Sequence, residues 1–279
     1  MIHASQRTIH RFKRIQALLD QLHPDNPPQA LIVPGSPEPC DNIIVFPGSF
    51  NPPTKAHIAL LKQARQYTRQ HAPTHLYVAI SKHIVDKEKV ERALLLDRIM
   101  LLETVLHHHL RQTGIMLFNR GLYVEQAEAV QRSFPKVKKL FFLIGYDKIV
   151  QILDPRYYDD RDTALKELFS LAEVFVVPRA GFGPKELEEL LHKPENEPFT
   201  RYIHPLPFST TYRNMSSSRI REHPDEYMHD LPPEVRRFML YTRAYAPPLH
   251  LTNGTEMDYY GERMKVLESL LHSSSDLKH

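Results

Sequence analysis

The sequence predicts an α/β fold in which a parallel sheet is flanked by helices. Two observations lead to this prediction. Short apolar runs alternate along the chain with longer segments of helical periodicity, which is the pattern of βαβ units. The apolar run 43–46 also stops at Pro47-Gly48, crosses an Asn-Pro-Pro turn and enters a helical pattern. Such sheets bind ligands at the carboxyl ends of their strands, so the residues that follow each strand are the candidate site residues.

Composition indicates an ordinary soluble protein. The chain has 279 residues, enough for one large α/β domain with appendages, of which 42% are hydrophobic and 25% charged. A single cysteine, Cys40, excludes an internal disulfide and fits a reducing compartment. Basic residues are scattered among acids at a net charge of +3, which gives no argument for nucleic-acid binding, so we expect no nucleic-acid partner. No apolar run approaches the length of a membrane span, so we expect no membrane partner and a cytoplasmic location, with nucleus and mitochondrion left open.

Residues 1–41 are expected to form an N-terminal helical extension and a linker. An amphipathic helical pattern covers residues 4–22. Four basic residues and no acid before Asp20 would also suit a transit peptide, but the apolar stripe continues past that acid, which favours a docking helix. A short strand at 30–33 and a proline-rich connector follow.

Residues 42–245 are expected to contain the sheet and its helices. Expected strands lie at 43–46, 75–80, 114–118, 139–144, 174–177 and 202–203. Expected helices lie at 57–64, 90–110, 124–133, 147–153, 163–170, 184–192, 218–221 and 232–244. Residues 246–279 are expected to be a C-terminal tail with a polar turn and one helix at 261–272.

The segment 43–57 predicts an anion-binding site. A strand, a glycine turn and a helix N-terminus in succession present outward backbone N–H groups, and the helix dipole favours negative charge. Gly48 lets the backbone approach a phosphate closely, and His57 adds a donor near the start of the helix. An ordinary strand-to-helix turn would account for Gly-Ser-Phe-Asn alone, but less well for the added Thr-x-x-His.

This segment resembles the first motif of the nucleotidylyltransferase superfamily, Gly-x-Phe-x-Pro followed by His/Thr-x-x-His. The version here is most similar to that of the nicotinamide and nicotinate mononucleotide adenylyltransferases, in which threonine replaces the first histidine. Thr54 for histidine and Ala56 for glycine depart from the broader pattern and make cytidylyltransferase chemistry a weaker expectation. The resemblance implies a Rossmann-like nucleotidylyltransferase fold. It assigns this segment's residues to ATP (Gly48, Ser49, Phe50 and His57) and to the acceptor (Asn51).

A second match lies at residues 214–221, Asn-Met-Ser-Ser-Ser-Arg-Ile-Arg. Consecutive serines at a helix start supply hydroxyls and free N–H groups, and Arg221 can direct its guanidinium at phosphate oxygens one turn later. A plain helix N-cap is the alternative. The stretch resembles the superfamily's Ile-Ser-Ser-Thr-x-Ile-Arg, which implies that Ser216, Ser217 and Arg221 bind the β- and γ-phosphates of ATP.

A third match follows the apolar strand 139–144, which ends in Gly145-Tyr146-Asp147. An acid at a strand's carboxyl end can serve ribose hydroxyls or a metal, or it can cap the next helix. The family has Gly-x-Asp at this place, which implies that Gly145 and Asp147 contact the nucleotide. The family's Pro-Arg-x-Gly after the strand 174–177 implies an acceptor contact for Arg179, for which a purely structural role is the alternative.

Recognition of the acceptor ring is where the chain departs from its relatives. They stack a tryptophan on the pyridine ring, and this chain has none. Tyr157 or Tyr158 could stack instead, and Tyr157 is preferred because it lies closer in sequence to the Gly-x-Asp strand end. Lys82 and Arg98 stand where relatives have acceptor-binding basic residues, although a solvated charge would explain either. The run His107–His109 predicts no metal site, because adjacent helical residues point about 100° apart.

Together these features predict an enzyme that joins the AMP of ATP to nicotinamide mononucleotide (NMN) or nicotinate mononucleotide (NaMN) and releases pyrophosphate. The attacking 5′-phosphate is already an anion at neutral pH, because its second pKa is about 6, so no general base is required. His57 and Arg221 are the expected catalytic residues. Mg²⁺ is expected to ride on the ATP phosphates and to keep several waters. The alternatives are an adenylyltransferase for another phosphate acceptor, such as phosphopantetheine, and a non-catalytic nucleotide-binding regulator. A homo-oligomer is left open.

Overall fold

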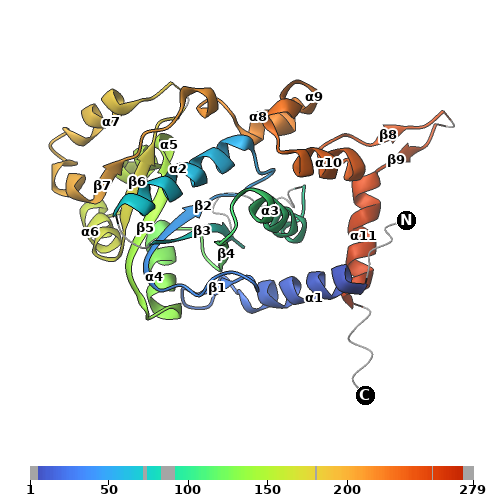
Figure 1. Ribbon diagram of the computed structural model, residues 1–279, viewed down its shortest axis with the longest axis horizontal. Helices are drawn as coiled ribbons and strands as arrows, with labels where there is room; N and C mark the ends of the chain where they lie inside the picture. Colours follow the sequence, from blue (N-terminus) through green and yellow to red (C-terminus); the bar gives the residue numbers. More distant parts are fainter. Residues whose placement is uncertain (1–5, 72–73, 83–91, 180, 253, 273–279) are drawn as a thin grey trace, which may run out of the picture.

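The computed structural model describes residues 6–71, 74–82, 92–179, 181–252 and 254–272. Within them, the centre of the molecule is a seven-stranded sheet in the order β1-β4-β3-β2-β5-β6-β7 (Figure 1). Its strands are β1 (Ala30–Ile32), β2 (Asp41–Pro47), β3 (Thr74–Ser81), β4 (Thr113–Phe118), β5 (Val137–Gly145), β6 (Glu173–Val177) and β7 (Ile203–Pro205). All neighbouring strands run parallel except β1, which pairs antiparallel with β4 at the edge. The predicted Rossmann-like α/β fold is confirmed; the short strand predicted at 30–33 is its edge strand β1, whose antiparallel orientation was not predicted.

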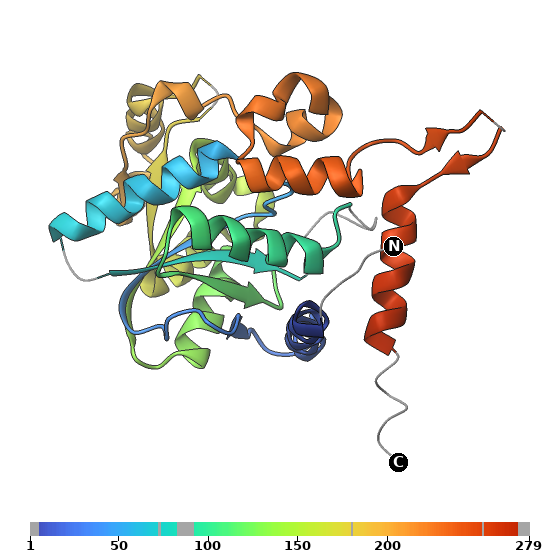
Figure 2. The same ribbon diagram turned by 45° about the vertical axis from the view of Figure 1, so that its right-hand side comes forward.

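Helices cover both faces of the sheet (Figures 1 and 2). One face is covered by α1 (Gln6–Gln21), α2 (Lys55–His71), α3 (Leu95–His109) and α10 (Pro233–Thr242), and the other by α4 (Tyr123–Ser133), α5 (Tyr146–Leu153), α6 (Arg161–Leu171) and α7 (Pro184–Leu191). In β2, Ile44 and Phe46 lie in the first core, while Ile43 and Val45 lie in the second. A strand buried on both faces has a continuous apolar run, which is why this one was recognisable in the sequence.

The strand order reverses beside β2. The chain passes from β2 through β3 to β4 in one direction, and from β5 through β6 to β7 in the other. Since β2 and β5 are neighbours, their carboxyl ends flank the reversal point, where sheets of this kind bind ligands. The segments that leave these two ends begin at Gly48 and Tyr146. The fold therefore brings two of the predicted motifs to one edge of the sheet.

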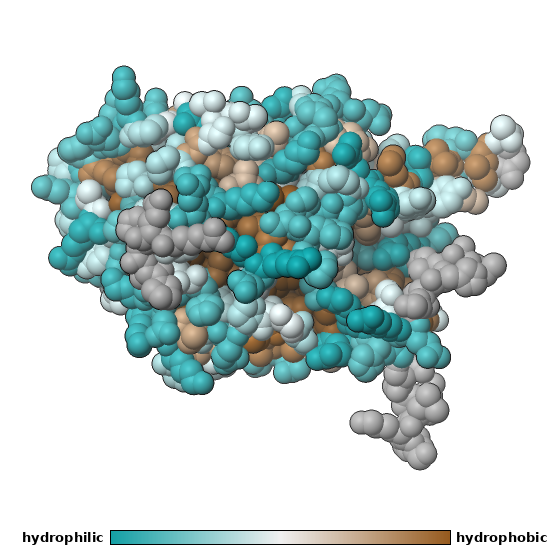
Figure 3. All heavy atoms as spheres, in the orientation of Figure 1, coloured by the Kyte–Doolittle hydropathy of each residue, from teal (hydrophilic) through white to brown (hydrophobic). Residues whose placement is uncertain are grey.

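Both ends of the described chain pack onto the central segment. Phe12 and Ile15 of α1 and Leu267 of α11 (Tyr259–His272) are buried in the same core as β2 and α3. A hairpin of β8 (Leu249–His250) and β9 (Glu256–Met257) projects from the molecule, and Figure 3 shows apolar spheres on it beside a mostly hydrophilic face. The boundaries predicted at 41 and 245 stay predictions. Among the described residues, the helices are all too short or too polar to cross a membrane.

Several helix boundaries differ from the prediction. Of the helix expected from Val90, residues 90 and 91 lie outside the described residues, and α3 begins at Leu95. The helix expected to reach residue 244 ends at Thr242, because Arg243 adopts a left-handed conformation with φ 52° and thereby terminates it. Beyond the predicted helix now seen as α8 (Ser217–Glu222), the short α9 (Pro224–Tyr227) was not predicted.

Candidate active site

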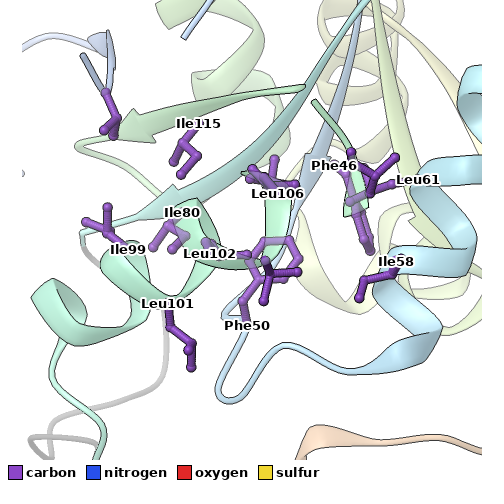
Figure 4. Packing of buried hydrophobic residues seen from close by; sticks show 14 of the residues in the cluster. Phe46, Phe50, Ile58, Leu61, Ile80, Ile99, Leu101, Leu102, Leu106 and Ile115 are labelled. Carbon is purple, nitrogen blue, oxygen red and sulfur yellow. The ribbon is translucent and has the colours of Figure 1, made fainter. Parts of the chain in front are cut away.

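The glycine turn after β2 is held from both sides. The Gly48 N–H donates to the carbonyl of Ala79 in β3 at 3.0 Å. A Cβ on Gly48 would come within 3.1 Å of the Phe50 ring, so a larger residue would push that ring aside. Phe50 is 1% exposed and packs among apolar residues of β3, α2 and α3 (Figure 4). The turn is therefore a fixed backbone surface at the carboxyl end of β2.

His57 lies in the first turn of α2, and its contact with Thr54 determines which ring nitrogen carries the proton. The backbone N–H of Thr54 donates to Nδ1 of His57 at 2.9 Å, so Nδ1 is an acceptor and the proton of the neutral ring is on Nε2. The ring of Phe50 packs edge-on to it at 5.0 Å. Burial, and after it the positive charge of Arg179, lowers the pKa of His57 from 6.5 to about 3. At neutral pH His57 is an uncharged N–H donor.

The serine-rich motif contacts the turn directly. The Ser217 hydroxyl donates to the carbonyl of Pro52 at 2.8 Å. One turn later, Arg221 donates through Nη1 to the carbonyl of Asn51 at 2.5 Å and through Nη2 to the Ser218 hydroxyl at 3.2 Å. Ser216 is the residue that precedes α8. The structure thus brings together two motifs that are far apart in the sequence, and Arg221 is hydrogen-bonded directly to the turn after β2.

Gly145, Asp147 and Arg179 form a second group at the carboxyl ends of β5 and β6. Nη1 of Arg179 lies 3.4 Å from a carboxylate oxygen of Asp147, and both side chains are about half exposed. A Cβ on Gly145 would lie 2.6 Å from that carboxylate and 3.3 Å from the Arg179 side chain, so glycine is what permits the pair to sit against the strand end. Because β5 pairs with β2 in the sheet, Gly145 and the glycine turn lie at neighbouring strand ends.

A pocket that sequence patterns did not indicate adjoins this pair. Its volume is about 290 Å³, and its walls are mostly apolar. It is lined by Tyr146, Val176, Val177, Pro178, Gly183, Pro184, Leu187, Pro205, Leu206, Pro207, Phe208 and Arg213. The ring of Tyr146 stacks on Phe182 with centroids 4.8 Å apart and planes at 9°. The residues come from separate segments of the chain, at or near the ends of β5, β6 and β7, so no single stretch of sequence indicates the pocket.

Asn51 and Arg98, both predicted acceptor contacts, are engaged in holding the backbone. The Asn51 side chain is fully buried, donates to the carbonyl of Arg92 at 3.0 Å and accepts from the N–H of Ala93 at 3.2 Å. Arg98 is 6% exposed and donates to the carbonyl of Ser49 at 3.2 Å. These contacts shape the turn, and a direct role toward the acceptor stays a prediction.

The remaining predicted residues, Lys82 and the two tyrosines, differ in their contacts and exposure. Lys82 donates to the carbonyl of Leu19 at 2.6 Å and so ties β3 to α1. Tyr157 is 62% exposed at the end of the 3₁₀ turn Pro155–Tyr157, whereas the Tyr158 hydroxyl donates to the carbonyl of Ile152 at 2.8 Å. Of the two tyrosines, Tyr157 is the one with a ring open to a ligand. Stacking on a pyridine ring remains a prediction for it.

Protein side chains offer little to a resident metal ion. Within the described part of the chain, no three histidine, cysteine, aspartate or glutamate side chains are grouped in a way that could hold one. In the histidine run at the end of α3, Nε2 of His109 lies 2.8 Å from the Glu234 carboxylate. The site itself presents His57, Arg179 and Arg221 as donors and Asp147 as a carboxylate. Such a donor set suits phosphate oxygens and any cation that those oxygens bring with them.

Comparison with known proteins gives one family match. The family model described as cytidylyltransferase-like matches residues 45–223, which include the glycine turn and the serine-rich motif. Among solved structures, a protein from Vibrio parahaemolyticus provisionally named nicotinate-nucleotide adenylyltransferase is similar at 14% identity and a TM-score of 0.41, over 72% of this chain and 99% of that one. At that level the structural match carries no argument about activity. No curated protein sequence matches the chain.

Proposed function

This chain belongs to the cytidylyltransferase-like family, and from that premise we propose that it is an adenylyltransferase for a pyridine mononucleotide. It transfers AMP from ATP to the 5′-phosphate of NMN or NaMN, which forms NAD or deamido-NAD and releases pyrophosphate. The family supports nucleotidyl transfer as the class of reaction. Thr54 supports the choice of acceptor, because threonine at this place is typical of the mononucleotide adenylyltransferases that the motif resembles.

The observation that carries the proposal is the convergence of His57 and Arg221 on the turn after β2. Arg221 and Ser217 both hydrogen-bond carbonyls of that turn, and His57 lies in the first turn of the helix that follows it. An oxygen of the acceptor phosphate attacks the α-phosphorus, the bond from that phosphorus to the bridging oxygen breaks, and pyrophosphate leaves with the electron pair. Reactions of this kind depend on positioning and on stabilising charge on the phosphates.

Each motif has a distinct task in this mechanism. The Nε2–H of His57 donates to the α- and β-phosphate region, where charge develops on the bridging oxygen. Ser216, Ser217 and Arg221 bind the departing pyrophosphate, with the planar guanidinium of Arg221 matching two phosphate oxygens. Backbone groups of Gly48, Ser49 and Phe50 line the nucleotide. Mg²⁺ that arrives with ATP would supply further charge neutralisation, and Asp147 would offer one carboxylate to it or to the ribose.

We place the adenine in the apolar pocket beside Tyr146. Its volume of about 290 Å³ is at the small end of the range for ligand sites, and apolar walls with flat aromatic rings suit a purine base. Asp147 and Arg179 directly follow Tyr146 and Pro178 of the pocket wall, and they pair with each other at 3.4 Å. A nucleotide with its base in this pocket would direct its ribose toward Asp147 and its phosphates toward the turn.

One assay tests the proposal against its alternatives. Purified protein is incubated with Mg²⁺, ATP and one acceptor at a time, namely NMN, NaMN or phosphopantetheine. A parallel reaction contains CTP and a phosphate acceptor of cytidylyltransferases. Pyrophosphate release and the mass of the product are measured. Product from NMN or NaMN alone supports the proposal. Product from another acceptor assigns the chain to that branch of the family. ATP binding without turnover on any acceptor would indicate a nucleotide-binding regulator.

A further inference from the structure

The C-terminal helix α11 lies outside the residues that match the family, yet it is anchored deep in the molecule. Tyr260, in its first turn, is fully buried. It forms a small apolar cluster with Ala93 and Ala244, separate from the cores on the two faces of the sheet. In Figures 1 and 2, α11 stands at one end of the molecule beside α10 and α1. A buried tyrosine hydroxyl usually has hydrogen-bond partners, and here they belong to the start of α3 and the residue before it.

The Tyr260 hydroxyl joins α11 to the start of α3. It accepts the N–H of Leu94, the residue before α3, at 2.8 Å, and it donates to the Asp97 carboxylate at 2.7 Å. Asp97 is 2% exposed and also receives Nε of Arg263 at 3.0 Å. Burial, and after it the Asp97 carboxylate, raises the pKa of Tyr260, so the hydroxyl keeps its proton. The C-terminal helix α11 therefore supplies hydrogen-bond partners to the Leu94 N–H and to the Asp97 carboxylate.

A second ion pair grips the chain just before α3. The guanidinium of Arg92 forms a two-point contact with the carboxylate of Asp258, the residue that precedes α11. Bidentate arginine–carboxylate contacts fix orientation as well as distance. Together with the Tyr260 hydroxyl, this pair holds residues 92–94 against the C-terminal segment.

The same short segment is hydrogen-bonded to the active-site turn on its other side. Asn51 donates to the carbonyl of Arg92 and accepts from the N–H of Ala93, and the Tyr245 hydroxyl donates to the same Asn51 oxygen at 2.6 Å. The carbonyl of Asn51 in turn receives Arg221. Residues 92–94 are thus a bridge with α11 at one side and the turn that contacts Arg221 at the other.

We propose that α11 is a brace for the turn after β2. Tyr260 and Arg263 of this helix, and Asp258 just before it, are positioning residues for adenylyl transfer. They fix residues 92–94, which orient Asn51, and Asn51 sets the position of the turn and of Arg221. The inference rests on the proposed function. It predicts that loosening the brace lowers the rate of chemistry, because small displacements of groups that position phosphates are costly to turnover.

The test compares Tyr260→Phe with Tyr259→Phe. Each change removes one phenolic hydroxyl, and the two residues are adjacent in α11. Tyr259 is 46% exposed, whereas Tyr260 is buried. Calorimetry gives the stoichiometry of ATP binding and hence the concentration of folded, ATP-binding protein. The value of kcat is measured well below the melting temperature and is expressed per ATP-binding site. We expect Tyr260→Phe to lower this kcat roughly 10- to 100-fold with a smaller change in the Kd for ATP, and Tyr259→Phe to change it less than twofold.

A second variant covers the case in which Tyr260→Phe does not fold. Asp258→Asn weakens the partly exposed pair with Arg92 and leaves the buried hydroxyl in place, and we expect a fall in kcat of about threefold or more. If the folded variants lose thermal stability but keep kcat per site within twofold of wild type, α11 is a structural prop only and the inference is wrong. If wild type has no adenylyl transfer activity, the proposed function falls and the inference falls with it.

Discussion

Replacing His57 tests the donor that the structure assigns to the reaction. His57→Ala removes Nε2–H, whereas His57→Gln keeps an N–H donor at about the same distance from the backbone. Loss of one donor to a developing negative charge typically costs 10²–10³ in kcat, or about 2.7–4 kcal/mol. We expect a fall of that size for His57→Ala and a smaller one for His57→Gln, measured as pyrophosphate release at saturating ATP and acceptor with melting temperatures as a control for folding.

The pH dependence distinguishes a neutral donor from a charged one. With a pKa of about 3, roughly one His57 in ten thousand is protonated at pH 7 in the free protein. The profile of kcat/KM for ATP should therefore show no inflection from His57 between pH 5 and 8. An acid limb near pH 6.5 that is present in wild type and absent in His57→Gln would refute the assignment of a neutral ring held by Thr54.

Stability gives an independent measurement of the same pKa. The unfolded chain binds a proton at His57 below about pH 6.5, whereas the folded protein does so only near pH 3, so folding stability is lost as pH falls between these values. The full difference corresponds to roughly 5 kcal/mol. Urea unfolding of wild type should weaken across this interval more steeply than unfolding of His57→Gln. Parallel curves for the two proteins would show that the pKa of His57 is close to its ordinary value.

Three further predictions concern the other groups of the site. Arg221→Lys should raise the KM for ATP and lower kcat, because lysine cannot present a planar fork to two phosphate oxygens, and wild-type values of both would remove Arg221 from the site. Gly145→Ala should displace the Asp147 carboxylate, which a Cβ would approach to 2.6 Å, and raise the KM for ATP roughly 10-fold in a folded protein; an unchanged KM would show that Asp147 makes no nucleotide contact. Tyr157→Ala should raise the acceptor KM about 3- to 10-fold with the ATP KM unchanged, and Tyr158→Ala is its partly buried counterpart; if neither moves the acceptor KM, the ring pocket is built elsewhere.

The elements of the central sheet followed from local sequence. The run 43–46 is apolar on both sides because helices cover both faces of the sheet, and helical periodicity between such runs leaves few ways to connect them other than parallel crossovers. The glycine turn and the serine-rich motif were recognisable because each resembles a motif of a known family. Each is one continuous stretch of chain, so its residue types and their spacing can be compared without the tertiary structure.

Tertiary structure decided which partner each polar side chain takes. The sequence predicted Lys82 and Asn51 as acceptor contacts, and only the structure shows that Lys82 ties β3 to α1 and that Asn51 holds residues 92 and 93. The adenine pocket proposed beside Tyr146 draws its walls from separate segments. The Tyr260 hydroxyl meets Leu94 and Asp97 across more than 160 residues of chain. Local periodicity reports which face of an element is apolar, whereas these contacts depend on how the elements pack, and so only the folded chain could show them.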